Sequence, residues 1–407
     1  MSFTETTTQS WGGRLMESIK GVLTGVALFL VSFVLLFMNE SCAVKSYQHN
    51  KDATKNAVVS DADTIDPAQD GKLIHINGEA RTSETLKDPD FAVSANAIHL
   101  VRSVEMYQWQ EDEKKTTKKN MGGSETTTTE YTYKQVWSDS LIDSSGFKQK
   151  DGHTNPSTFP VQEHKMTAEV VTLGAYRLPK TLINELSGGK TLTLTNAALE
   201  GLAPAVKQRA RIETGNIYIA APLLAVQATG ANGGTVTATA TATTSGPQIG
   251  DVRVSFTTVE PKTVTVQAMQ KGEELMGFVG KTGTILRMES GALTIEQFSD
   301  VVKGQIATRT WILRLVGFLM MAMGVGLVFA PLAVFGDVIP FIGGLMRSGI
   351  FLVAVAVALP LSLITIAISW VVVRPLVGIP LLLLAIGSIV AAIVMNKKGK
   401  SAAPAAA

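Results

Sequence analysis

The sequence predicts a membrane protein of the α+β class, with four transmembrane helices and one large β-rich extracytoplasmic domain between the first and the second. Four uncharged apolar runs lie at 21–39, 315–336, 348–373 and 375–396. Each is long enough to cross a hydrocarbon core, which takes about 20 helical residues. The long segment between the first two runs holds most of the charged residues and a series of short β-type runs.

These runs divide the chain into seven parts. They are a cytoplasmic N-terminal segment (1–20), transmembrane helix 1 (21–39), the extracytoplasmic domain (40–314), transmembrane helices 2 (315–336), 3 (348–373) and 4 (375–396), and a cytoplasmic tail (397–407). The orientation follows from Lys and Arg in the short segments, which gather on the side of both termini. Within the first part, the polar, Thr-rich residues Met1 to Ser10 are expected to be frayed.

The first apolar run is interpreted as an uncleaved anchor. It is longer than the apolar core of a normal signal peptide, and no small-residue cleavage site follows it. Asn39 and Glu40 occupy positions that a lipoprotein cleavage site would fill with small or apolar residues. Cys42, the single cysteine, excludes an intramolecular disulfide and is expected to be a packing residue at the membrane exit.

The extracytoplasmic domain shows the pattern of β-strands. Short runs rich in β-branched and aromatic residues, several of them alternating with period two, are separated by Gly, Asn, Asp and Pro. These runs are Leu73 to Ile76, Val101 to Trp109, Tyr131 to Trp137, Val252 to Thr258 and Thr263 to Met269. The charged, Thr-rich residues Glu111 to Glu130 are expected to form a solvated hairpin. A capping box at Thr294 and Gln297 predicts a helix that continues through Trp311 into the second span.

Small residues in the spans permit close approach between helices. Gly21 and Gly25 lie four residues apart in the first span, and Gly317, Gly324 and Gly326 lie in the second. Two interpretations follow: packing of the helices within one chain, or association of one chain with another. The second interpretation predicts a homo-oligomer.

The sequence offers no catalytic, cofactor-binding or metal-binding residues, so we expect a protein that is not an enzyme. The five histidines lack ligand spacing, and nucleotide-binding loops and hydrolase elbows are missing from the sequence. His75 lies in an apolar strand and is expected to be a core histidine, and Glu105 has no second carboxylate positioned beside it. A net charge of +2 without a basic patch argues against nucleic acid as a partner. Spans without ionisable residues disfavour transport.

Several motifs resemble the transmembrane protein 43 family, also called LUMA. They include Gly71-Lys72-Leu73-Ile74-His75-Ile76-Asn77-Gly78, Val104-Glu105-Met106-Tyr107-Gln108-Trp109, Gly152-His153 with Asn155-Pro156-Ser157, Gly250-Asp251 with Arg253-Val254-Ser255-Phe256, and Arg374-Pro375-Leu376. The Asn39-Glu40 exit from the first span is also similar. The resemblance extends from the first span to the fourth.

The resemblance implies a four-span membrane scaffold that self-associates and organises membrane protein complexes or lipids. Animal members reside in the endoplasmic reticulum and inner nuclear membrane. The Thr- and Ala-rich stretch near Thr235 and the Ala-rich tail depart from the family and favour a bacterial member, whose location would be the inner membrane. The expected partners are membrane lipids, other membrane proteins and a second copy of the chain, and no cofactor is expected. An envelope sensor, or an enzyme acting on lipids or an extracytoplasmic ligand, is the alternative.

Overall fold

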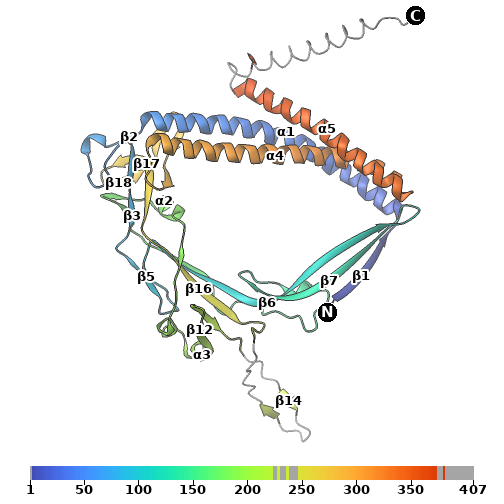
Figure 1. Ribbon diagram of the computed structural model, residues 1–407, viewed down its shortest axis with the longest axis horizontal. Coiled ribbons are helices and arrows are strands. Elements are labelled where there is room, and N and C mark those ends of the chain that lie inside the picture. The colour runs from blue at the N-terminus through green and yellow to red at the C-terminus, as the bar shows by residue number, and fades with distance from the viewer. Residues whose placement is uncertain (1, 223–226, 230–234, 238–245, 374–378, 381–407) are drawn as a thin grey trace, which may run out of the picture.

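Three long helices lie along one side of the molecule and two β-sheets lie along the other (Figure 1). The computed structural model describes residues 2–222, 227–229, 235–237, 246–373 and 379–380. Its long helices are α1 (Trp11–Asn56), α4 (Ile295–Gly336) and α5 (Pro340–Val373), and each is long and apolar enough to cross a membrane. The α+β class is confirmed. The fourth predicted span and the tail fall, apart from 379–380, outside the described residues.

The helices extend beyond the apolar runs that predicted them. α1 starts ten residues before its run and continues 17 residues past it, and it packs along α4. α4 ends at Gly336 and begins at the capping box. There the Gln297 amide donates to Thr294 Oγ1 at 3.2 Å, and the Thr294 amide donates to Gln297 Oε1 at 2.9 Å. The predicted continuous helix from the sheets into the second span is therefore confirmed.

The first sheet has eight strands in the order β1-β7-β6-β16-β13-β12, with β11 on β16 and β8 on β6. Its strands are β1 (Ser2–Gln9), β6 (His99–Lys119), β7 (Glu125–Ser138), β8 (His164–Thr167), β11 (Lys190–Thr191), β12 (Ala210–Glu213), β13 (Asn216–Ile219) and β16 (Val252–Val259). Alternate residues of β16, such as Val252, Val254 and Phe256, are buried against η3 (Asn196–Leu199) and neighbouring loops. Helix α3 (Pro204–Lys207) lies beside this core.

The second sheet has seven strands and joins the first to the helices. Its strands are β2 (Val58–Val59), β3 (Leu73–Arg81), β9 (Thr172–Leu173), β10 (Tyr176–Arg177), β17 (Lys262–Lys271), β18 (Glu274–Met276) and β21 (Arg287–Ser290). Helix α2 (Lys180–Glu185) packs on it, and η1 (Pro67–Gln69) and η2 (Ser144–Gly146) are short 3-10 helices. Three two-stranded sheets are β4 (Thr85–Lys87) with β5 (Ser94–Asn96), β14 (Gln227–Thr229) with β15 (Thr235–Thr237), and β19 (Phe278–Gly280) with β20 (Gly283–Ile285). All five predicted strands are confirmed.

The N-terminal segment is not frayed. It forms β1, which pairs antiparallel with β7 at eight positions, from Ser2 with Thr132 to Gln9 with Glu125. The prediction was wrong because the segment has no apolar alternation. Its partner is also Thr-rich, and facing Thr side chains support a sheet through cross-strand contacts. The assignment of 1–20 and 40–314 to opposite sides of a membrane stays a prediction, and this shared sheet argues against it.

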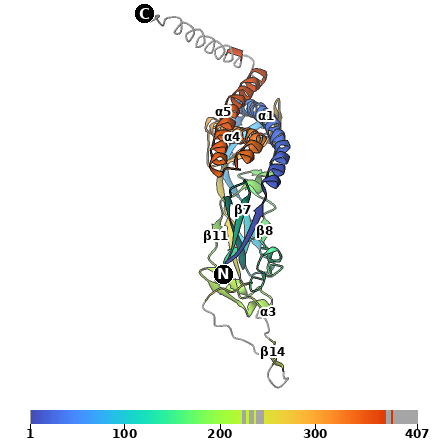
Figure 2. The same cartoon turned by 90° about the vertical axis from the view of Figure 1, so that its right-hand side faces the viewer.

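The β6–β7 hairpin contacts the helices at its tip, and the sheets from which it extends are joined to α1 through β2. We call this ring of strands and helices the closed circuit. β6 has 21 residues, or about 69 Å of extended chain. α1 has 46 residues, or about 69 Å of helix. In Figure 1 the hairpin of β6 and β7 leaves the sheets, arches away from the helices and meets them again at its tip. The view in Figure 2 shows β7 rising toward the same end of the bundle.

Candidate functional site: an apolar helix bundle with a polar cluster at each end

The small residues pack α1 closely against α4. A Cβ added at Gly25 would lie 2.8 Å from the Gly324 carbonyl oxygen, and one added at Gly324 would lie 2.8 Å from the Gly25 carbonyl oxygen. Gly317 packs in the same way on Leu36. The interpretation of packing within one chain is therefore confirmed for these glycines. Gly326 is different, because a Cβ there would meet no atom within 4 Å.

Large apolar side chains cover the outside of the bundle. On α1 they recur every three or four residues, and Leu23 is 77% exposed. The exposed residues of this stripe are Met16, Ile19, Leu23, Val26, Leu30, Val34 and Met38. α4 and α5 carry further exposed residues, among them Leu315, Leu319, Met323, Phe351, Leu352 and Leu363. So large an apolar surface indicates contact with lipid or with other proteins.

On the side of the second sheet, an ion pair holds the three helices together at the point where α5 ends. Arg314 binds both carboxylate oxygens of Glu40, with Nε 2.6 Å from Oε1 and a second nitrogen, Nη2, 2.8 Å from Oε2. Trp370 Nε1 donates to Oε2 at 2.7 Å. We call these three residues the sheet-end cluster. Glu40 is 2% exposed, and a buried carboxylate needs partners that compensate its charge. Both of its oxygens accept hydrogen bonds from the Arg314 and Trp370 side chains.

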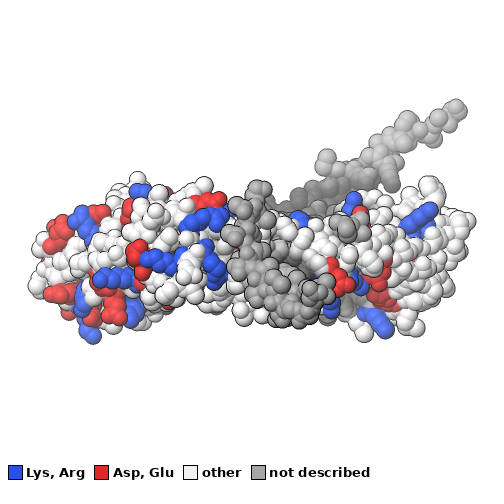
Figure 3. All heavy atoms as spheres, turned by 90° about the horizontal axis from the view of Figure 1, so that it is seen from below, with Lys and Arg blue, Asp and Glu red and all other residues white. Residues whose placement is uncertain are grey.

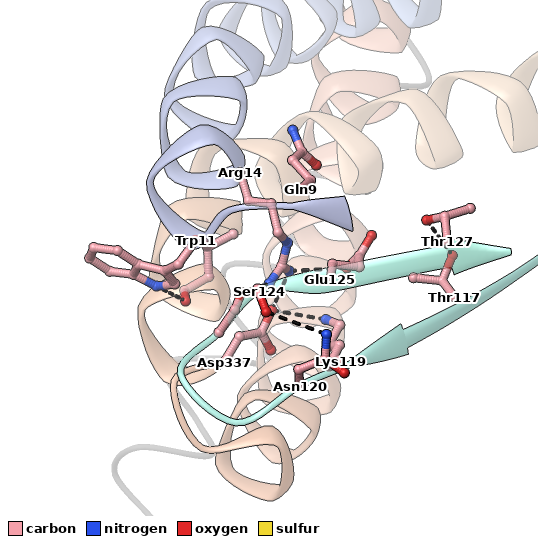
Figure 4. A network of polar contacts seen from close by, with 12 residues as sticks. Gln9, Trp11, Arg14, Thr117, Lys119, Asn120, Ser124, Glu125, Thr127 and Asp337 are labelled. Carbon is pink, nitrogen blue, oxygen red and sulfur yellow. Dashed lines mark hydrogen bonds and ion pairs between the residues drawn. The ribbon is translucent and has the colours of Figure 1, made fainter. Parts of the chain in front are cut away.

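At the other end, Asp337 gathers three cations, as Figure 4 shows in part. The Oδ2 atom of Asp337 accepts from Arg14 Nη2 at 2.5 Å and from Lys119 Nζ at 2.9 Å, and it also accepts from Arg347. Glu125 lies 3.3 Å from Arg14 Nη2. We call these five residues the hairpin-end cluster. Its members come from α1, β6, β7, α5 and the residue that follows α4, so it joins the hairpin to all three helices.

The hairpin tip hydrogen-bonds to the helix bundle and packs against it. Arg14 Nη1 donates to the Gly123 carbonyl at 2.5 Å, and the Gly122 amide donates to the Val338 carbonyl at 3.1 Å. The Trp11 ring covers Gly123, where a Cβ would lie 2.4 Å from Trp11 Cδ1. Trp11 Nε1 donates to the Val334 carbonyl at 2.9 Å. The predicted hairpin is therefore confirmed, but its tip is bound to the helices and not simply solvated.

A buried polar chain connects the second sheet to α1 and α4. Asn50 donates to the Ser299 carbonyl at 3.0 Å and accepts from Arg287 at 3.0 Å. Arg287 also donates to Gln267, which contacts His75 Nδ1 at 3.1 Å. Burial lowers the pKa of Arg287 to about 10 and lowers the pKa of His75 below its ordinary value. His75 is a core histidine, as predicted, and it also belongs to this structural chain.

The other residues considered for chemistry do not converge. Glu105 pairs with Arg253 at 2.9 Å on the sheet surface. His153 stacks on Tyr133 and packs against Trp109. Cys42 is exposed, which corrects its expected packing role. Among the described residues no group of three or more His, Cys, Asp or Glu side chains is arranged to hold a metal ion.

Sequence reasoning missed both clusters, although the pattern gave a partial signal. Arg14 and Asp337 are 323 positions apart, and Glu40 and Arg314 are 274 apart. Glu40, Arg314 and Asp337 lie directly at the borders of apolar runs, and Arg14 lies in the segment that leads into the first run. A charge at such a position is ordinarily assigned to solvent or headgroups. The available signal is that Glu40 and Asp337 are acidic residues next to apolar runs. A carboxylate that is buried at such a position requires a cationic partner.

Comparison with known proteins finds relatives over most of the chain. The family model described as transmembrane protein 43 matches residues 106–375. Over 375 residues the chain is 31% identical to transmembrane protein 43 of Mus musculus and of Homo sapiens, covering 89% of this chain and 87% of each relative. The Drosophila melanogaster homolog is 26% identical over 372 residues, covering 89% of this chain and 91% of its own. No solved structure matches. The chain belongs to the transmembrane protein 43 family and is an integral membrane protein.

Proposed function

We propose that this protein is a membrane scaffold that self-associates and organises membrane protein complexes or lipids. The observation that carries the proposal is the apolar surface of the bundle. Its stripe on α1 is left exposed after α4 and α5 have packed. Surfaces of this size are typical of contact sites. Lipids, other membrane proteins and a second copy of the chain are the partners that suit it.

The polar groups support a structural role. Within each cluster the buried charges pair with charges of opposite sign. His75 and Arg287 hydrogen-bond within the polar chain that links the second sheet to the helices. None of these groups combines a nucleophile with a positioned base, the arrangement that catalysis requires. We therefore favour a protein that is not an enzyme.

One observation favours the alternative of a lipid sensor or lipid-acting enzyme. A groove of about 530 Å³ lies between α1 and α4, with apolar walls that include Val34 and Met38. Arg309 and Gln305 line it as well. Such a groove suits an acyl chain whose anionic headgroup meets Arg309.

Gly326 provides the test of self-association. Its open surroundings leave a small-residue position on α4 free for a neighbouring chain. We expect chemical cross-linking in native membranes to give oligomers of the wild type. Gly326→Leu adds bulk where a neighbour would approach, and overpacking of about 1 to 3 kcal/mol would weaken association roughly five- to 150-fold.

Gly349→Leu is the matched control, because Gly349 also faces open space but lies on α5. It should leave the oligomer distribution unchanged at equal expression. A wild type that stays monomeric would overturn the proposal. An oligomer that both variants leave intact would remove this face of α4 from the interface.

The location also remains a proposal. We infer an inner-membrane protein with an extracytoplasmic β-rich domain, if the source is bacterial. Figure 3 views the face opposite the helices, where Lys and Arg alternate with Asp and Glu. Mixed charge of this kind suits an aqueous compartment on the side of the sheets.

A further inference from the structure

We propose that α1 and α4 form a binding site for one anionic phospholipid with two acyl chains. Arg309 binds the lipid phosphate, and the two chains occupy apolar grooves that meet at this residue. The inference rests on the lipid contact in the proposed function, and it names the class of lipid and the residue that selects it. It does not depend on self-association.

Arg309 lies at the depth where α1 leaves its apolar run. Asn39 is the last residue of that run, and its side-chain amide donates to the Thr310 carbonyl of α4 at 3.1 Å. Arg309 precedes Thr310, so a helical rise of about 1.5 Å separates the two residues along the axis. The headgroup layer on each side of a hydrocarbon core is about 5 to 7 Å thick. Arg309 therefore falls within the layer that holds lipid phosphates.

The guanidinium of Arg309 is available to bind an anion. Arg309 is exposed, and its side chain forms no ion pair or hydrogen bond with any residue that the structure describes. Arg314 differs, because its Nε and Nη2 atoms already bind Glu40. The planar fork of an arginine matches two phosphate oxygens and binds them through charge-assisted hydrogen bonds. A phosphate group at Arg309 would supply the counter-charge that the chain does not.

The first groove is the one of about 530 Å³ between α1 and α4. Its apolar wall on α1 is formed by Val31, Val34 and Met38, which are 52%, 57% and 57% exposed. All three belong to the first apolar run, so this part of the groove lies in hydrocarbon. Ser46 and Gln305 line the part beyond the border of the run. The groove thus changes from apolar to polar at the depth of Arg309, as a lipid does between its acyl chains and its headgroup.

A second groove, of about 690 Å³, lies along α4. Its apolar part is formed by Leu313 and by Ile312, which is 56% exposed, and both lie on the membrane side of Thr310. Arg309 and Leu313 line both grooves. Both volumes fall within the range of small-molecule sites in proteins. Two apolar grooves that meet at one cation match a lipid in which two acyl chains meet at one phosphate.

The charge of the site selects an anionic lipid. Arg309 is the only charged residue among the described residues that line the two grooves. A zwitterionic phospholipid carries a cationic group beside its phosphate, and no carboxylate in either lining is placed to bind that group. An anionic phospholipid lacks the extra cation and keeps its full attraction to Arg309.

The test uses Cys42, the single cysteine of the chain, which is exposed and lines the first groove. The full-length protein is placed in vesicles of phosphatidylcholine with increasing fractions of phosphatidylglycerol, and the rate of alkylation of Cys42 by an uncharged maleimide is measured. A bound lipid covers the thiol, so phosphatidylglycerol should slow the reaction in the wild type. Arg309→Gln should raise the fraction of phosphatidylglycerol that gives half-maximal protection roughly five- to tenfold. Arg309→Lys keeps the charge and should retain part of the protection.

Lys45→Gln is the matched control, because Lys45 is an exposed cation on α1 near the same border and lines neither groove. It should behave like the wild type. An anionic surface by itself slows thiol alkylation in every variant, so equal slowing in the wild type, Arg309→Gln and Lys45→Gln would overturn the proposal. Protection by soluble glycerol phosphate would also overturn it, because the site would then not require acyl chains. Protection in phosphatidylcholine alone that rises with the ratio of protein to lipid would identify a second copy as the occupant, which again overturns it.

A second measurement covers the case in which the bound lipid leaves Cys42 open. Native mass spectrometry of protein released from an equimolar mixture of the two lipids counts the molecules of each that stay bound. The wild type should retain phosphatidylglycerol in preference to phosphatidylcholine, and Arg309→Gln should lose that preference. A wild type without the preference would overturn the proposal, whatever the rate at Cys42. Failure here would leave the cross-linking result at Gly326, and with it the scaffold proposal, unaffected.

Discussion

Each polar cluster of the helix bundle contains one buried carboxylate, and the two carboxylates are compensated by different partners. At the sheet end, Glu40 uses both oxygens for one bidentate arginine and one indole, and all three residues come from helices. At the hairpin end, Asp337 uses one oxygen for three cations, while its Oδ1 has no hydrogen-bond partner among the described residues. The first arrangement fastens helix to helix. The second closes the circuit between the helices and the sheet.

The largest effect is expected from Asp337→Ala. Its removal leaves Arg14, 7% exposed, and Lys119 without their shared counter-charge. Breaking a buried ion pair costs about 3 to 5 kcal/mol. We expect a large fall in thermal stability in mild detergent, together with new proteolytic cleavage in the hairpin.

The control for that variant is Asp300→Ala, which removes an exposed ion pair with Lys303. Such a pair contributes about 0 to 1 kcal/mol. If the two variants were equally stable and equally resistant to protease, the hairpin-end cluster would not hold the circuit closed.

Glu40→Gln should have a smaller effect of a different kind. The amide keeps one acceptor for Arg314 or Trp370, so the loss is that of a charge-assisted hydrogen bond, about 1.5 to 3 kcal/mol. Because the sheet-end cluster joins helices only, we expect lower thermal stability with a hairpin that stays protected from protease. Cleavage in the hairpin of Glu40→Gln would mean that the two ends are not independent.

The packing of the hairpin tip can be separated from its backbone strain with two neighbouring glycines. Gly122 and Gly123 have φ values of +83° and +80°, so alanine is strained at both. A Cβ at Gly122 meets nothing within 4 Å, whereas one at Gly123 collides with Trp11. Thermal unfolding should therefore show Gly123→Ala less stable than Gly122→Ala by about 1 to 3 kcal/mol. Equal losses would show that Trp11 does not pack on the tip.

The smallest effect is the contribution of His75 to the pH dependence of stability. Burial lowers the pKa of His75, so the unfolded chain takes up a proton near the ordinary value of 6.5 while the folded chain resists it. Its contribution to stability is present above that pH and is lost as the pH falls through the lower folded pKa. We expect His75→Gln to lose less stability than the wild type between pH 7.5 and pH 5.5, whereas His164→Gln, at an exposed position, should behave like the wild type. An identical acid response in all three proteins would exclude His75 as the source.

The features that the sequence predicted correctly are those that depend on residues close together in the chain. The five β-type runs became strands because period-two alternation is a local signal, and the Thr294 box began α4 because its partners lie three residues apart. Gly25 and Gly324 could be recognised as packing residues, but nothing local states that they face each other. β1 and both clusters depend on contacts between distant segments. Their residue types, threonines and border charges, are ordinarily found in solvent.

The central claim is that the N-terminal strand belongs to the sheet of the hairpin, which closes the circuit. The most direct measurement is disulfide formation in native membranes with the pair Thr6→Cys and Thr128→Cys in a Cys42→Ala background, since Thr6 and Thr128 face each other across β1 and β7. Facing residues of antiparallel strands have Cα atoms about 4.5 to 5.5 Å apart, within the range that a disulfide spans. The pair Thr6→Cys and Thr132→Cys is four residues out of register, about 13 Å away along the strand, and serves as the control. Rapid oxidation of the first pair alone is the predicted result, and a first pair that stays reduced in folded protein would contradict the account.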